Sequence, residues 1–103
     1  MTTYANTSYV AKNVGTSAST LTTVSSGTIA ITSLVVANTT SSPITTDVYF
    51  TRSATDYYIV KTATVPVGGS LEVIGGNRVV LIASDALKVV TSAASSADVV
   101  VSV

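Results

Sequence analysis

Side chains branched at the β-carbon dominate this sequence and constrain its fold more than any other feature. The chain has 103 residues, of which 18 are Val, 18 are Thr and 6 are Ile. Branching at the β-carbon restricts rotamers in a helix but packs well on a pleated surface, so these residues favour strands. Leu, Lys, Glu and Gln, which usually build surface helices, are scarce. The sequence therefore predicts an all-β protein.

Short apolar runs alternate with clusters of turn-forming residues along the whole chain. The predicted strands, eight or nine in number, are 9–14, 20–24, 28–37, 44–51, 57–65, 71–74, 79–82, 87–91 and 97–103. This spacing is typical of a single-domain antiparallel β-sandwich, either jelly-roll or immunoglobulin-like. The length of the chain favours one domain over residues 1–103.

Three of these strands carry more specific expectations. Within 28–37 the apolar residues change parity, which predicts a bulge or two-sided burial near Thr32. The strand 44–51 alternates and is expected to form a hairpin with 57–65. The strand 79–82 is apolar on both parities, which predicts a central position in a sheet. Five residues near the C-terminus are predicted to face inward: Leu87, Val89, Val99, Val101 and Val103.

The composition excludes much site chemistry. Without His the chain lacks the usual general base and the commonest metal ligand. Without Cys it has no thiolate nucleophile, disulfide or Cys-ligated metal. Zero net charge, from ten charges spread along the chain, leaves no electrostatic footprint for nucleic acid. No catalytic, cofactor-binding or metal-binding residues are therefore predicted, and the chain is expected not to be an enzyme.

Individual motifs agree with that expectation. The glycine pairs Gly68-Gly69 and Gly75-Gly76 lack the lysine of a phosphate-binding loop and are interpreted as turns. The five acids are scattered singly, at turns or on outward strand positions, so they are interpreted as surface or turn-capping groups. An enzyme would need folding to bring two of them together. A Ser–Lys dyad is formally available but follows from the abundance of serine.

No membrane or secretion signal is apparent. The longest aliphatic run, 79–83, is far shorter than the roughly 20 residues of a spanning helix. The N-terminus lacks the basic and apolar regions of a signal peptide. We therefore expect no membrane partner, and synthesis in a cytoplasm.

Aromatic residues gather at the predicted hairpin. Tyr49, Arg52, Tyr57 and Tyr58 form the candidate contact patch, because Tyr and Arg are enriched at interface hot spots. Tyr57 and Tyr58 are consecutive in a strand, so one is expected in the core and the other outside. The alternative interpretation is ordinary cross-strand packing. At the N-terminus, residues 1–9 are a candidate arm in which Tyr4 and Tyr9 would contact a neighbour.

Hydroxyl groups replace charges over much of the predicted surface. Ser and Thr supply 33 of 103 residues, whereas charged residues make up 10%. The surface of a free monomer is normally about a quarter charged. A neutral, hydroxylated surface is easier to desolvate, and little repulsion keeps strand edges apart. We therefore expect a homo-oligomer, dimer or trimer, or a subunit packed onto a larger lattice.

From about Gly27 onward, the order of elements resembles that of small all-β virion proteins of tailed bacteriophages. The stretches that carry the resemblance are Leu34–Thr39, Tyr57–Lys61, Val65–Leu71, Ser84–Val89 and Ala97–Val103. The chain departs from the pattern at Ser84, where such proteins often have Gly before the Asp. The resemblance implies a structural role in an oligomeric β-sandwich, as a capsid decoration (cement) protein or a tail accessory protein.

These observations favour a non-enzymatic virion protein that decorates the capsid and bridges shell subunits. Its partners would be other virion proteins. The alternative is a tail-associated module that binds a host surface or a glycan through the exposed tyrosines and hydroxyls.

Overall fold

The computed structural model describes residues 8–74 and 78–103 and confirms the all-β prediction. The described residues form ten strands: β1 (Ser8–Val14), β2 (Ser19–Thr23), β3 (Thr28–Ile31), β4 (Ser33–Asn38), β5 (Ile44–Arg52), β6 (Thr55–Val65), β7 (Ser70–Glu72), β8 (Val79–Ile82), β9 (Ala86–Thr91) and β10 (Ala97–Ser102). Within these residues no helix is long and apolar enough to cross a membrane.

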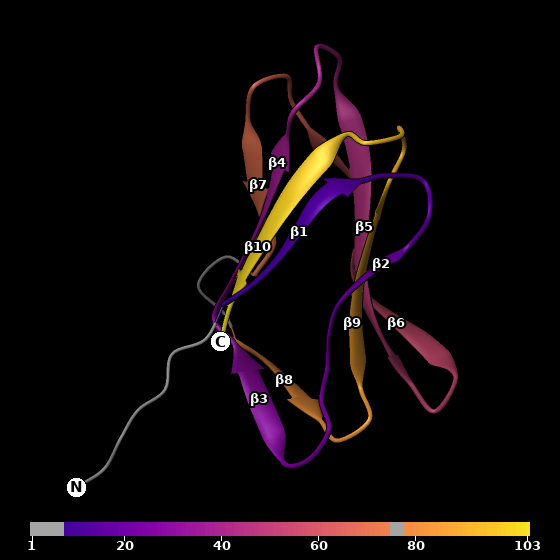
Figure 1. Ribbon diagram of the computed structural model, residues 1–103, viewed down its shortest axis with the longest axis vertical. Helices are drawn as coiled ribbons and strands as arrows, with labels where there is room; N and C mark the ends of the chain where they lie inside the picture. The colour runs from indigo at the N-terminus through magenta and orange to yellow at the C-terminus, as the bar shows by residue number, and fades with distance from the viewer. Residues whose placement is uncertain (1–7, 75–77) are drawn as a thin grey trace, which may run out of the picture.

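The strands pair as the rungs of one long hairpin closed by the turn between β5 and β6. β5 pairs with β6, β4 with β7, β3 with β8, β2 with β9 and β1 with β10, always antiparallel. Pairings of β10 with β4 and of β5 with β9 join these rungs into the sheets β1-β10-β4-β7 and β2-β9-β5-β6 (Figure 1). Such a doubled ribbon, wound into two packed sheets, is a jelly roll, one of the two predicted sandwich types.

Inward-facing residues of the two four-stranded sheets fill the core. Val36 of β4 lies opposite Val99 of β10, and Val48 of β5 lies opposite Val89 of β9. All four side chains are fully buried, each stabilising the fold by about 1.5 kcal/mol or more. Four of the five residues predicted to face inward near the C-terminus are buried: Leu87, Val89, Val99 and Val101. The fifth, Val103, follows the end of β10 and is only half-buried, packed against the core.

The predicted strand 28–37 is two strands in the structure. β3 pairs with β8 in a separate two-stranded ribbon, whereas β4 lies inside a four-stranded sheet. Thr32 separates them, and its amide donates to the carbonyl of Ser102 at 2.9 Å. The parity change in the sequence thus marks a change of sheet rather than a bulge, and it accounts for the extra strand.

The expectation for 79–82 is wrong. β8 lies in the two-stranded ribbon, not at the centre of a sheet. Leu81 is fully buried, but Val80 and Ile82 are exposed. A ribbon of two strands packs only one of its faces against the core. Apolar residues on both faces of a strand therefore do not establish that both faces are buried.

Several predicted features lie at the ends of strands. The hairpin of β5 and β6 is confirmed, with a turn of two residues, Ser53 and Ala54, that both have positive φ. Gly68 also has positive φ, in a turn closed by the hydrogen bond from the Gly69 amide to the Pro66 carbonyl. The predicted turn at 75–77 lies outside the described residues. Of the candidate arm, residues 8 and 9 belong to β1, and residues 1–7 lie outside the described residues.

Candidate functional site

The hairpin of β5 and β6 divides the predicted contact patch between two faces. Tyr49 lies opposite Tyr58, and Phe50 lies opposite Tyr57. The ring centroids are 5.0 Å apart in the first pair and 5.4 Å in the second. Cross-strand partners share a face, whereas consecutive residues alternate. Tyr49 and Tyr58 are therefore together on one face, and Tyr57 lies with Phe50 and Arg52 on the other.

Burial at this hairpin differs from the expectation for the tyrosine pair. Tyr57 and Tyr58 are 49% and 46% exposed, so neither lies in the core. Tyr49 is the buried member of the patch, at 8% exposed. β6 is an edge strand, and the end of the hairpin lies away from β4 and β7 of the opposite sheet (Figure 1). Tyr57 therefore lies on the core-facing side with Phe50, but near the end of the hairpin, where it remains exposed.

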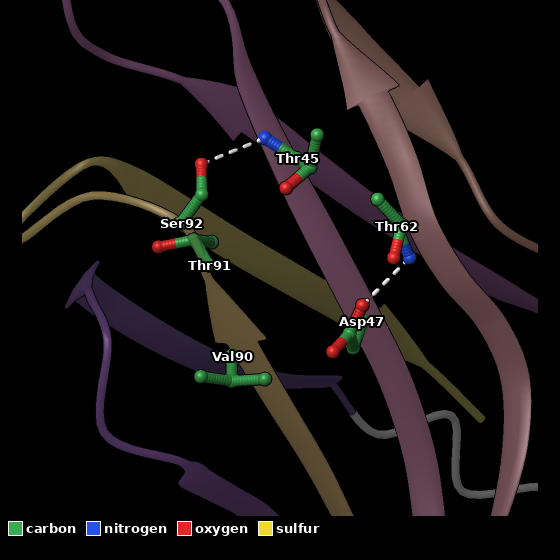
Figure 2. A pocket seen from close by; sticks show the side chains of 6 residues that line it. All are labelled: Thr45, Asp47, Thr62, Val90, Thr91 and Ser92. Atoms are coloured by element: carbon green, nitrogen blue, oxygen red, sulfur yellow. Dashed lines mark hydrogen bonds between the residues drawn. The ribbon is translucent and has the colours of Figure 1, made fainter.

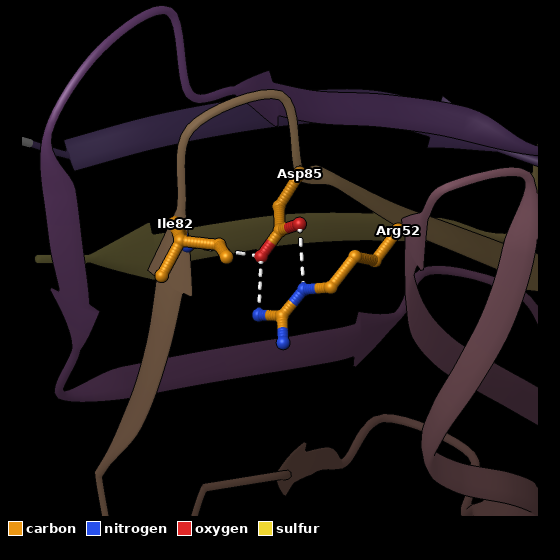
Figure 3. Close-up of polar contacts among 3 residues, drawn as sticks. All are labelled: Arg52, Ile82 and Asp85. Atoms are coloured by element: carbon orange, nitrogen blue, oxygen red, sulfur yellow. Dashed lines mark hydrogen bonds and ion pairs between the residues drawn. The ribbon is translucent and has the colours of Figure 1, made fainter.

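Arg52 is held by an ion pair with Asp85. Its Nε and Nη2 donate to Oδ1 and Oδ2 of Asp85 at 2.9 and 2.6 Å (Figure 3). The guanidinium also lies 5.2 Å from the centre of the Phe50 ring, in cation–π geometry. The Asp85 side chain is fully buried, whereas that of Arg52 is 38% exposed. One edge of the Arg52 guanidinium is therefore exposed at this surface, and the other edge binds Asp85 and anchors the hairpin.

Asp85 joins three loops through its side chain and backbone. Oδ2 also accepts the Ile82 amide at 2.9 Å, and the Asp85 carbonyl accepts the Val24 amide at 2.9 Å. The hydrogen bonds from Arg52, followed by the Ile82 amide, hold the pKa of Asp85 below its ordinary value. Asp85 lies at a turn, as expected, but it is a buried structural anchor rather than a solvated surface group.

On the outer face of the same hairpin, Tyr58 is packed between two neighbours. The Lys61 ammonium lies 4.4 Å from the centre of the Tyr58 ring, and Tyr49 contacts the ring as described above. Lys61 also forms an ion pair with Asp47, at 3.6 Å. Burial, with a smaller contribution from Asp56, raises the pKa of Tyr49. The exposed part of Tyr58 is therefore a rigid aromatic edge.

A hollow of about 150 Å³ opens beside β5 (Figure 2), and Asp47 in its lining lies two residues before Tyr49 on that strand. It is lined by Thr45, Asp47, Thr62, Val90, Thr91 and Ser92. Asp47 accepts the Thr62 amide at 2.6 Å, and Ser92 Oγ accepts the Thr45 amide at 3.0 Å. The hollow is thus lined mainly by hydroxyls and contains one carboxylate that is already hydrogen-bonded.

The other sheet presents a different outer face. Val10 of β1 lies opposite Val100 of β10, which lies opposite Val35 of β4. Val10 is 73% exposed, Val100 is 46% exposed and Val35 is half-buried. We call these three residues the valine row. Sequence reasoning missed it, although Val99-Val100-Val101 is apolar on both parities and thus signals an apolar outer position.

The charged groups beside the valine row are held by contacts within the protein. Lys12 pairs with Asp98 at 3.2 Å, and hydrogen bonds from the Asn13 amide and Lys12 lower the pKa of Asp98. Glu72 accepts the Ser33 hydroxyl at 2.7 Å and the Leu34 amide at 2.9 Å, which lowers the pKa of Glu72. The row therefore lies between an ion pair, Lys12–Asp98, and a carboxylate, Glu72, that is hydrogen-bonded to neutral groups.

Of the two candidate arm tyrosines, the structure describes only Tyr9. Tyr9 lies in β1, half-buried and packed against the core, and Tyr4 lies outside the described residues. No group of three His, Cys, Asp or Glu side chains that could hold a metal ion occurs in residues 8–74 and 78–103. Comparison of the chain with family models, with curated proteins and with solved structures finds no match in any of the three.

Proposed function

We propose that this chain is a non-enzymatic structural protein of a tailed-bacteriophage virion, and that it decorates the capsid shell. The observation that carries the proposal is the valine row, an exposed apolar strip across three strands of one sheet face. Contiguous exposed apolar surface marks interaction sites more often than isolated exposed residues do.

The charge distribution supports docking of this face. Three of the five basic residues, Lys12, Arg52 and Lys61, form ion pairs within the chain. Beside the valine row, Lys12 and Asp98 compensate each other, and Glu72 lies opposite Val35 at the far end of the row, where a partner would have to match its charge. Binding would be driven mainly by burial of apolar area, at about 25 cal/mol per Å². A subunit that bridges two neighbouring shell proteins in this way would oppose their separation.

The fold is compatible with this role but does not by itself specify it. Jelly rolls occur in viral capsid proteins and also in lectins, and a fold does not specify a function. The resemblance of the sequence to small phage virion proteins favours the first setting, and the valine row favours a protein partner.

The decisive experiment is electron cryomicroscopy of particles from the genome that encodes this chain. We expect density for the chain at equivalent positions across the whole shell, with the valine row against a shell protein. Particles assembled with Val100→Ser should lose occupancy, whereas Val80→Ser, a matched exposed valine on β8, should not. Density confined to the tail, or absent from the particle, would refute capsid decoration.

The hollow beside Tyr49 and Tyr58 favours a second candidate, a glycan-binding module of the tail. Hydroxyls, a carboxylate and an exposed aromatic edge are the groups that bind neutral sugars. The test is saturation-transfer NMR of the whole chain with a panel of neutral oligosaccharides. Tyr58→Ala should abolish the signal and Tyr57→Ala, on the opposite face, should retain it. Equal loss in both variants, or no transfer to any sugar, would refute this candidate.

A further inference from the structure

The free edge of β1 differs from the other outer edges of the two four-stranded sheets. Figure 1 shows the order β7, β4, β10, β1, in which β1 ends one sheet. β7 has only three residues, β2 has a register irregularity, and β6 has irregular pairing together with charged side chains. Short length, bulges and charges are the devices that prevent edge-to-edge pairing.

Residues 8–11 of β1 carry none of these devices. They pair regularly with Ser102, Val101, Val100 and Val99, and the irregularity of β1 begins only after Ala11. Ser8-Tyr9-Val10-Ala11 contains no charge and no proline. The first charge, Lys12, is already paired with Asp98.

We infer that this edge pairs with the same edge of a second copy of the chain, in an antiparallel arrangement about a two-fold axis. The inference deepens the proposed function, because it names how the decorating subunit would oligomerise. A two-fold axis perpendicular to the sheet keeps outward residues opposite outward residues, so only registers that match parity are allowed.

In one of these registers, the side chains that oppose each other across the two copies are compatible on both faces of the sheet. This register places Val10 opposite Val10 of the second copy, Tyr9 opposite Ala11, and Ser8 opposite Lys12. The bulky Tyr9 then meets a small residue on the inner face, and no two like charges oppose each other. On the outer face, the two valine rows join end to end across the dimer. The joined row doubles the apolar strip that the proposed function presents to the shell.

The interface is small, which sets the conditions of the test. Two edges of about five residues bury less than the roughly 1,200 Å² of a standard interface. We therefore expect a dissociation constant on the order of 100 µM for the isolated chain. Sedimentation velocity from about 5 µM to about 1,000 µM spans this range.

Sedimentation of the full chain tests the dimer directly. The chain should pass from monomer to dimer across the concentration series. Val10→Lys should raise the dissociation constant at least about tenfold, because it places two ammonium groups opposite each other. Val80→Lys, at another exposed valine, on β8, should leave it unchanged. A chain that stays monomeric throughout, or an equal effect of both variants, overturns the inference.

Cysteine cross-linking tests the register, because the chain has no native Cys. Val10→Cys should form a disulfide-linked dimer under mild oxidation, since directly opposed residues lie about 5 Å apart. Ser8→Cys should not, because four residues of offset separate its two copies by about 13 Å. Comparable linking of Ser8→Cys or Val80→Cys overturns the register.

The result for the dimer is separable from that for the proposed function. Val10 also belongs to the valine row, so loss of the dimer in Val10→Lys with full particle occupancy would overturn both the edge pairing as part of decoration and the role of this end of the row. A dimer in solution that never appears on the shell refutes decoration and leaves the edge pairing intact.

Discussion

Arg52 and Asp85, separated by 33 residues in sequence, form a two-bond ion pair in which the carboxylate is fully buried and the guanidinium is partly exposed. The pair ties the tip of the β5–β6 hairpin to the turn between β8 and β9. Asp85 also accepts the Ile82 amide, so its carboxylate satisfies three donors from two elements. This anchor determines where the exposed edge of Arg52 and the ring of Phe50 lie.

Replacement of this carboxylate by an amide should destabilise the fold. In Asp85→Asn, the Arg52 guanidinium loses its counter-ion, and an amide N–H must face one of the three donors. We expect unfolding free energy to fall by about 2–3 kcal/mol, a drop of roughly 10 °C in Tm. Thermal unfolding followed by circular dichroism measures this.

The matched control is Asp98→Asn, which removes the carboxylate of the exposed Lys12–Asp98 pair. Exposed pairs are screened by water and contribute little, so the control should lose much less stability. If the two variants lose equal stability, Asp85 is not the anchor described here.

Stability should fall with acid and stay nearly flat near neutrality. The folded chain holds the pKa values of Asp85, Glu72 and Asp98 below their ordinary values of 3.8, 4.5 and 3.8. Below those values the unfolded chain takes up protons that the folded chain does not, so stability is present above about pH 5 and lost as pH falls further. No His titrates between these acids and neutrality.

Urea unfolding at a series of pH values measures this loss. Each proton taken up on unfolding contributes a slope of about 1.4 kcal/mol per pH unit. Asp85→Asn should show a shallower slope below pH 4, because one of the three groups is gone. A stability that rises as pH falls from 5 to 3 would contradict the assignment.

The sequence predicts local features of this fold well and long-range partners poorly. Alternation fixes which side of β9 and β10 faces inward, so Leu87 and Val99 are buried as predicted. The alternation of apolar and polar residues along 44–51 also predicts the β5–β6 hairpin correctly. These features depend on neighbours within a few residues, which is the information that periodicity contains.

What the sequence could not predict depends on which element lies opposite. Tyr57 is exposed because no strand covers the hairpin end, and Val80 is exposed because β8 has only one covered face. The pairing of Arg52 with Asp85 requires the nested strand order, which also separates jelly-roll from immunoglobulin-like topology. No spacing in the sequence specifies these contacts.

Replacement of Ser84 by glycine should stabilise the fold. Its φ is +75°, in the left-handed region that glycine adopts without strain. A side chain in this left-handed region costs about 1–2 kcal/mol, part of which is offset by the greater freedom of glycine in the unfolded chain. Ser84→Gly should therefore raise unfolding free energy by about 0.5–1 kcal/mol. Ser84→Ala, which keeps the β-carbon, should give no gain, and a gain equal to that of glycine would contradict the strain.

The turn between β5 and β6 should also be stabilised by residues that favour positive φ. The effect on folding kinetics would show when this hairpin forms. Ser53 and Ala54 have φ of +53° and +63°, and two-residue turns with both φ positive prefer Asn-Gly. The double substitution Ser53→Asn, Ala54→Gly should raise unfolding free energy by about 1 kcal/mol. The effect on kinetics is more informative than the effect on stability.

In the nested strand order, β5 and β6 are the pair with the shortest chain between them, and β1 and β10 are the most distant. Loop-closure entropy favours formation of the shortest pair first. The stabilised turn should therefore speed folding, with most of its free energy visible in the folding limb of a urea chevron. Ser84→Gly, in the turn between β8 and β9, should act mainly by slowing unfolding. If the hairpin variant changes only the unfolding rate, the hairpin forms after the transition state and folding begins elsewhere in the ribbon.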